Sequence, residues 1–251
     1  VIIHIGFPKT GTSFLQKSFH ENISQLKKLN INYPNPKDQN LPRMAEVDWD
    51  TPKNGFLLLN DEHLKESFNL KKTLYSEEGL FRILLEKKKR SSLLDYFSKN
   101  NIKVRFIVFY RDFYQHSIST WNQYIKRGKG AMKYHQFMLS GEYRDLRRLK
   151  KWIEISIAEG FDISVFKYDS HKKDLFKFFL EKVLGIKDIK SFSYENRRIN
   201  RSLDYSEIEF VRLLNKEFGS KVTDTVIKKL RWIDLPYDST AKPFITKDDY
   251  K

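Results

Sequence analysis

The chain has 251 residues, 40% of them hydrophobic and 15% aromatic, so it can bury a sizeable core and a disordered chain is excluded. Its 47 Lys and Arg residues against 32 Asp and Glu residues give a formal net charge of +15, which favours polyanionic partners such as nucleic acid, acidic glycans, anionic membranes or a multiply charged nucleotide. The lack of cysteine excludes disulfides, thiolate zinc sites and cysteine nucleophiles, and favours a reducing compartment or a bacterial source.

A strand, a glycine-bearing loop and a helix open the chain. Residues 1–5 (VIIHI) are apolar and mostly β-branched, which predicts a short buried strand. The loop 6–11 follows, and apolar residues at helical spacing over 12–29 then predict a helix that starts at Thr12 or Ser13. This order of elements is the context in which a phosphate-binding loop has meaning.

The rest of the chain alternates predicted strands with predicted helices. Residues 33–55 contain four prolines and little periodicity, which indicates a surface excursion, and residues 56–64 are ambiguous between strand and helix. We expect strands at residues 72–76, 104–110 and 163–168, and helices at residues 79–100, 111–128, 143–160, 172–185 and 202–218, the last with a capping pattern at Ser206. This alternation predicts an α/β fold of P-loop type, with a mostly parallel central sheet flanked by helices on both faces. We expect one domain over residues 1–251, with an irregular insertion at 33–70, and no membrane span, since no run of eighteen apolar residues exists.

The loop GFPKTGTS is similar to a nucleoside-triphosphatase P-loop with a displaced lysine. Gly6 and Gly11 keep the glycine spacing of G-x-x-x-x-G-K-[ST], but Thr12 stands where the lysine belongs, and Lys9 lies three residues early. The strongest later strand ends at Arg111, where a triphosphatase would have a carboxylate that holds its metal. We therefore expect a loop that holds phosphate without a metal, through backbone N–H groups, a helix N-terminus and the lysine.

Two motifs together resemble the sulfotransferases that use 3′-phosphoadenosine 5′-phosphosulfate (PAPS), in their bacterial and Golgi carbohydrate-type forms. GFPKTGTSFLQ is similar to the 5′-phosphosulfate loop of that family, and Arg111 with Ser119 eight residues later is similar to its 3′-phosphate site, with Ser117 as an alternative contact. Residues 163–186 and 200–215 also resemble that subgroup. The resemblance implies a sulfotransferase-like domain whose cofactor-binding residues are Pro8, Lys9, Thr10, Gly11, Thr12, Ser13, Arg111, Ser119, Arg198 and Asn200.

The resemblance also implies the reaction, which is metal-independent in-line transfer of the sulfuryl group from PAPS to a hydroxyl or amine of an acceptor. Lys9 would stabilise the charge that grows on the bridging oxygen. The segment LYSEEGL resembles the S-S-E-G-L of carbohydrate-type relatives, which aligns Glu78 with their catalytic glutamate. Glu77 is adjacent and stays open as the general base. The remaining candidates for the base are Glu62, His63 and His116.

The acceptor is less well defined by the sequence. The basic segment 143–151 and the segment 132–137 are candidates to line a cleft for an acidic oligosaccharide. The subgroup resemblance implies a polysaccharide, oligosaccharide or glycolipid acceptor, and no nucleic acid. We expect a cytoplasmic bacterial protein, with a membrane-anchored or Golgi-lumen origin left open because the sequence begins at Val1, inside an apolar run.

Two other functions compete with the sulfotransferase. A P-loop kinase or nucleotide hydrolase is disfavoured by the missing G-K-[ST] lysine and the missing acidic strand end. A non-catalytic polyanion-binding module is motivated by the net charge of +15, but the base-stacking aromatic pattern that usually accompanies such patches is not visible.

Overall fold

The computed structural model describes residues 1–34, 53–59, 72–128, 130–193, 203–219 and 225–227. The chain divides into two compact units. The first combines residues 1–112 with 145–197, and the second combines 113–144 with 198–251. The first unit contains the sheet and the second is helical.

A five-stranded parallel sheet forms the centre of the first unit, in the order β2-β3-β1-β4-β5. Its strands are β1 (Ile2–His4), β2 (Ile31–Asn32), β3 (Lys72–Ser76), β4 (Arg105–Tyr110) and β5 (Asp162–Lys167). Four of them confirm the predicted strands, while β2 was not predicted, because two residues carry too little pattern. Since all the pairs are parallel, the carboxyl ends of the strands share one edge, which is where α/β sheets bind ligands.

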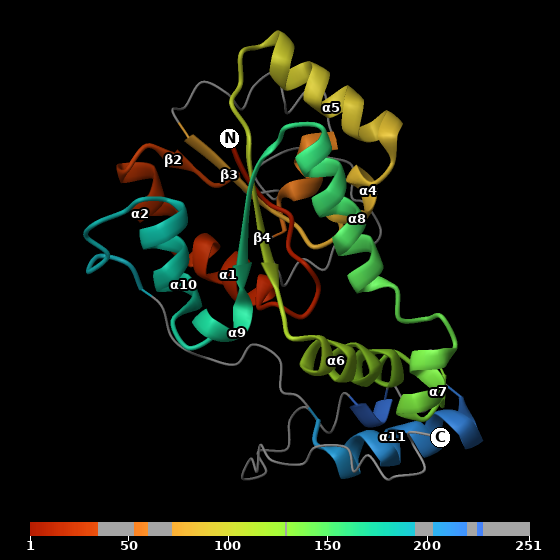
Figure 1. Ribbon diagram of the computed structural model, residues 1–251. Coiled ribbons are helices and arrows are strands. Elements are labelled where there is room, and N and C mark those ends of the chain that lie inside the picture. Colours follow the sequence, from red (N-terminus) through yellow and green to blue (C-terminus); the bar gives the residue numbers. More distant parts are fainter. Residues whose placement is uncertain (35–52, 60–71, 129, 194–202, 220–224, 228–251) are drawn as a thin grey trace. The chain divides into compact units, whose positions relative to one another are not determined.

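Helices cover both faces of this sheet (Figure 1). On one face lie α1 (Thr12–Glu21), α2 (Ile23–Lys28) and α10 (Leu175–Phe178), the last continuing into a π-helical turn, η4 (Phe179–Val183). On the other face lie α4 (Leu80–Leu84), α5 (Lys87–Lys99), α8 (Asp145–Ala158) and the 3₁₀ turn η2 (Gly55–Leu59). In β4, Ile107 and Phe109 pack into the core on the side of α1 and α10. Phe106 and Val108 pack into the core on the side of α5 and α8, because successive side chains of a strand point to opposite faces. The predicted α/β class, with helices on both faces, is confirmed.

Several predicted helices differ in detail from the structure, and the one expected over 79–100 is divided into α4 and α5. The helix expected over 12–29 is broken at Asn22, whose side-chain amide donates to the carbonyl oxygens of Ser18 (2.8 Å) and Ser193 (2.6 Å) and accepts from the N–H of Ser193 (2.8 Å). These contacts with a segment remote in sequence end α1 and start α2. The helix α11 (Tyr205–Phe218) is capped by Asp204, whose carboxylate accepts from the N–H of Glu207 at 2.8 Å, so the predicted cap at Ser206 is wrong by two residues.

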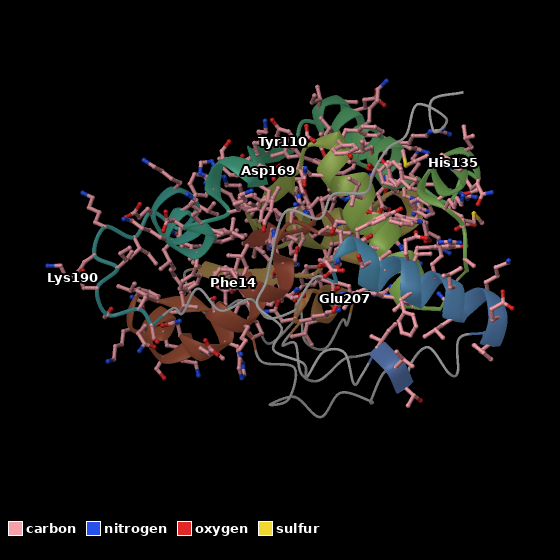
Figure 2. The ribbon with its side chains drawn as sticks, turned by 90° about the horizontal axis from the view of Figure 1, so that it is seen from below. Phe14, Tyr110, His135, Asp169, Lys190 and Glu207 are labelled. Atoms are coloured by element: carbon pink, nitrogen blue, oxygen red, sulfur yellow. The ribbon has the colours of Figure 1, made fainter. Side chains whose placement is uncertain are left out.

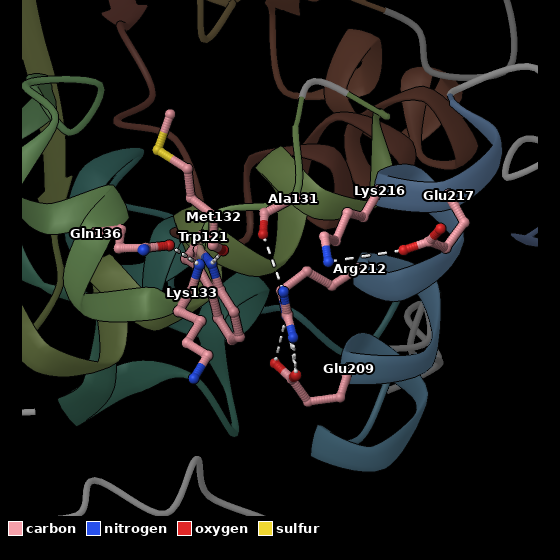
Figure 3. Close-up of polar contacts among 9 residues, drawn as sticks. All are labelled: Trp121, Ala131, Met132, Lys133, Gln136, Glu209, Arg212, Lys216 and Glu217. Atoms are coloured by element: carbon pink, nitrogen blue, oxygen red, sulfur yellow. Dashed lines mark hydrogen bonds and ion pairs between the residues drawn. The ribbon is translucent and has the colours of Figure 1, made fainter.

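The second unit packs α6 (Phe113–Lys126), α7 (Tyr134–Leu139) and α11 around a core that includes Trp121, Phe137 and Val211. Figure 3 shows a contact that ties α11 to the rest of the unit: Arg212, which also donates to Glu209 of the same helix at 2.9 Å, donates to the carbonyl oxygen of Ala131 at 3.1 Å. The indole of Trp121 donates to the carbonyl oxygen of Met132 at 2.9 Å. Within the described parts of both units, no helix has the length and apolar character needed to cross a bilayer. That residues 1–251 form one domain stays a prediction.

Candidate active site

The loop between β1 and α1 turns sharply and presents the N-terminus of a ten-residue helix. Lys9 and Gly11 both have a left-handed backbone, with φ of 66° and 76°. A lysine rarely adopts this conformation, and such residues concentrate at functional sites. Position 11 favours glycine, because its left-handed backbone strains other residues and a Cβ atom there would lie 2.7 Å from Leu175 Cδ2 and 3.0 Å from Tyr168 Cε2. The conformation of the loop therefore depends on Gly11, and the half-buried Lys9 lies within the turn.

The polar side chains of the loop divide into one that shapes it and one that can donate to a ligand. Thr10 donates its hydroxyl to the carbonyl oxygen of Phe7 at 2.5 Å and so closes the turn. The hydroxyl of Thr12 is buried and has no hydrogen-bond partner among the residues that the structure describes. Ser13, next to it, is half-buried on the first turn of α1. A helix N-terminus with an unused hydroxyl donor fits an anionic group such as a phosphate.

A buried polar cluster connects β1 and α1, which flank this loop, to the end of β3. Ser76 Oγ lies 2.8 Å from Nδ1 of His4, and the carbonyl oxygen of Ser76 accepts from the side-chain amide of Gln16 at 3.0 Å. His4 is fully buried, and desolvation lowers its pKa to about 3, so its ring is neutral at physiological pH. The cluster fixes α1 relative to the residues that follow Ser76. No local sequence pattern predicts this cluster, because Ser76 is far in sequence from both His4 and Gln16.

The two adjacent carboxylates after β3 lie in different environments. Glu77 is 2% exposed, its N–H donates to the carbonyl oxygen of His4 at 3.0 Å, and its Oε1 accepts from the N–H of Gly79 at 3.1 Å. Burial raises the pKa of Glu77 to about 7. Gly55 covers it so closely that a Cβ there would lie 2.3 Å from Glu77 Cβ. Glu78 is half-exposed, so it is the more accessible of the two.

Arg111 follows β4 at the same edge of the sheet, since β4 pairs with β1. Its guanidinium lies above the ring of Tyr168, 5.6 Å from the ring centre, and its Nε lies 3.5 Å from Oδ1 of Asp169. Both contacting residues come directly after β5. The structure therefore places the loop, the two glutamates and Arg111 along one edge of the first unit. The contact with Asp169 was not predicted, because it joins segments that are far apart in the sequence.

The predicted residues of the second unit are in part engaged elsewhere. Ser117 is buried, donates to the carbonyl oxygen of Tyr114 at 2.9 Å and lies 2.6 Å from the hydroxyl of Tyr134, so it is a core residue of that unit. His116 is buried too, with Nδ1 2.7 Å from the hydroxyl of Tyr143. Ser119 is half-buried on the same helix, which leaves it the better candidate of the two serines.

Several predicted residues lie outside the described residues. They are Arg198 and Asn200 of the proposed nucleotide loop, Glu62 and His63 among the alternative bases, and most of the expected insertion at 33–70. Their roles stay predictions.

A hollow lies along α8, and Lys150 is the one basic residue of the segment 143–151 that lines it. That hollow, of about 510 Å³, has a mostly apolar lining that includes Tyr110, Leu149, Lys150, Ile153 and Val165. Among the described residues of the chain, no three His, Asp or Glu side chains gather where they could hold a metal ion.

The fold and the site define an α/β protein with a glycine-bearing loop and a helix N-terminus at the carboxyl edge of a parallel sheet. Comparison with solved structures finds a likeness to a sulfotransferase from Alicyclobacillus acidocaldarius, 11% identical, over 93% of this chain and 96% of that one, with a TM-score of 0.45. A likeness at this level assigns neither a family nor an activity. No protein-family model and no curated protein matches the chain.

Proposed function

We propose that the protein is a sulfotransferase that moves the sulfuryl group of PAPS to a hydroxyl or amine of a carbohydrate or glycolipid. The observation that carries this proposal is the pair of cationic positions at one edge of the sheet, Lys9 after β1 and Arg111 after the neighbouring strand β4. PAPS has two separate anionic ends, so it needs two separate cationic sites. The orphaned hydroxyl of Thr12 and the α1 N-terminus supply further donors for the 5′ end.

The loop residues would bind the phosphosulfate and stabilise the leaving group. Pro8, Lys9, Thr10, Gly11, Thr12 and Ser13 form this set by resemblance to the sulfotransferase loop. In the reaction, a bond forms between the acceptor oxygen and sulfur while the bond from sulfur to the bridging phosphate oxygen breaks. Negative charge then grows on that oxygen, and the ammonium group of Lys9 is the point charge that can offset it. Arg111 suits the 3′-phosphate because a planar guanidinium can bond two oxygens at once. Ser119, Arg198 and Asn200 complete the proposed nucleotide set.

Glu78 is the proposed general base, with Glu77 as the alternative. The acceptor hydroxyl loses its proton as it attacks, and a carboxylate within hydrogen-bond distance takes that proton. Glu78 is half-exposed and can meet an acceptor, whereas Glu77 is covered by Gly55. The raised pKa of Glu77 is nevertheless close to the value that suits a base at neutral pH.

Calorimetric titration tests the proposal directly. We expect adenosine 3′,5′-bisphosphate, the reaction product, to bind without a metal and more tightly than ATP with Mg²⁺ or a short DNA duplex. Arg111→Ala should lower the affinity for the bisphosphate by roughly 10- to 100-fold, which is the cost of losing hydrogen bonds to a charged group. Preference for ATP with Mg²⁺ would instead favour a kinase or hydrolase, and binding of DNA alone would favour a polyanion-binding module.

A further inference from the structure

The carboxylate of Asp169 holds the turn that carries Arg111 by two contacts. Its Oδ2 accepts from the N–H of Asp112 at 2.9 Å, and its Oδ1 lies 3.5 Å from Arg111 Nε. The Arg111 and Asp169 side chains are 20% and 19% exposed, so the pair is largely shielded from water. Figure 2 shows Asp169 close to Tyr110, the last residue of β4, which pairs with Lys167 of β5. One side chain thus hydrogen-bonds the backbone of this turn and forms an ion pair with its guanidinium, whose Nε has no hydrogen-bond partner among the described residues.

The residue before Asp169 connects the same turn to the glycine loop. The ring of Tyr168 lies under the guanidinium of Arg111, and its Cε2 is the atom that a Cβ at Gly11 would approach to 3.0 Å. Tyr168 and Asp169 both belong to α9 (Tyr168–His171), the short helix after β5. This helix therefore contacts both anion-binding elements of the proposed site.

An arginine held in place before its ligand arrives loses less rotamer freedom on binding. Asp169 contacts Arg111 at Nε, one of five N–H donors on the guanidinium, and a phosphate needs only two of them. The negative charge of Asp169 acts in the opposite direction, because it repels a phosphate. A phosphate bound at the terminal nitrogens would lie nearer to the charge of Arg111 than to the carboxylate of Asp169, which contacts Nε, so the repulsion is smaller than the attraction. Orientation is therefore expected to outweigh repulsion.

We propose that Asp169 is a positioning residue that orients Arg111, and that it thereby makes the protein prefer adenine nucleotides with two separate phosphate groups over those with one. This inference rests on the function proposed above. It assigns to Asp169 no contact with the nucleotide, only with the arginine that binds it.

Two ligands separate this role from a merely structural one. Adenosine 3′,5′-bisphosphate would use both anion sites, whereas adenosine 5′-monophosphate would use the loop alone. In calorimetry we expect Asp169→Ala to weaken binding of the bisphosphate about tenfold, the lower end of the range known for residues that orient metal ligands, and binding of the monophosphate less than about twofold. Asp169→Asn should lower the affinity for the bisphosphate about threefold, because its amide oxygen still accepts from the N–H of Asp112 while the ion pair with Arg111 is gone.

A matched control is Asp188→Ala. The exposed Asp188 also accepts from a backbone N–H, that of Lys190 at 3.0 Å, and no site residue contacts it in the described part of the chain. We expect this variant to bind both ligands as the wild type does. If Asp169→Ala does not fold, Asp169→Asn carries the test with its smaller loss.

Three results would overturn the inference. Bisphosphate binding by the Asp169 variants that equals or exceeds the wild-type affinity would show that repulsion, not orientation, dominates. Equal weakening of both ligands would show a structural role. A wild-type protein that binds no bisphosphate would overturn the proposed function first and this inference with it, which is a different outcome from the other two.

Discussion

At the scale of single residues, Glu77 and Glu78 show how neighbours in sequence acquire different chemistry. We expect Glu78→Gln to leave the affinity for adenosine 3′,5′-bisphosphate unchanged and to lower the sulfuryl-transfer rate about 10²- to 10⁴-fold, because an amide cannot accept the acceptor's proton. Glu77→Gln should retain most of the activity, since its carboxyl is covered. Turnover with labelled donor and a panel of glycan acceptors measures both variants. The opposite order of activities would make Glu77 the base.

The pH dependence of stability reports the ionisation of Glu77 without any substrate. Its pKa rises from 4.5 to about 7 on folding, chiefly through desolvation. The folded state then holds a proton that the unfolded state has released, so stability is full below pH 4.5 and falls as the pH rises through about 7. In acid, we expect the wild type and the neutral Glu77→Gln variant to have the same free energy of unfolding. Above pH 7, the free energy of unfolding of the wild type should be lower by about 3 kcal/mol at most.

Denaturant unfolding at several pH values measures that difference, and Glu78→Gln is the control because Glu78 is half-exposed. A difference between wild type and Glu77→Gln that stays constant from acid to alkaline pH would contradict the raised pKa.

At the scale of elements, local sequence patterns predicted the strands and helices that neighbouring residues determine. They missed the features that depend on contacts between distant segments of the chain. The strand at 1–5, its loop and the following helix were predictable because their apolar spacing and glycines lie within one short segment. The break at Asn22 was not, since its partner Ser193 is 171 residues away. In the site, the loop and Arg111 carried local signals. The contact between Asp112 and Asp169 spans 57 residues and carried none.

The junction between α5 and the end of α8 gives a prediction at this scale. Arg90 is 4% exposed and donates to Glu159 at 2.6 and 2.9 Å and to the carbonyl oxygen of Leu84 at 2.8 Å. Glu159→Ala leaves a buried guanidinium without its carboxylate, so we expect a loss of about 1–3 kcal/mol in the free energy of unfolding. Chemical denaturation measures the loss.

The matched control lies on α8 itself. Glu154 pairs with Lys150 at 3.7 Å, with both side chains well exposed. We expect Glu154→Ala to change the free energy of unfolding by no more than about 0.5 kcal/mol. Equal losses for the two variants would mean that burial of Arg90 does not decide the stability of this junction.

At the scale of the whole molecule, a net charge of +15 attracts any polyanion, so binding of an anion is not by itself evidence for a site. A built site and a diffuse field differ in how they respond to salt. Diffuse binding to a duplex releases many counterions, and its affinity falls steeply with salt concentration. Contacts from a shielded arginine and a helix N-terminus are local and are screened much less.

We therefore expect DNA affinity to fall at least about 10³-fold between about 50 and 200 mM salt if six or more phosphates are contacted. Bisphosphate affinity should fall by about tenfold or less over the same range, because its few contacts lie within the site. Replacing the exposed Lys87 and Lys88 of α5 by glutamine should weaken DNA binding alone, since the proposed site does not use them. Parallel titrations of both ligands across salt concentrations measure these slopes. If the bisphosphate lost affinity as steeply as DNA and in the same lysine variant, the general charge of the protein would explain its binding, and the loop and Arg111 would not.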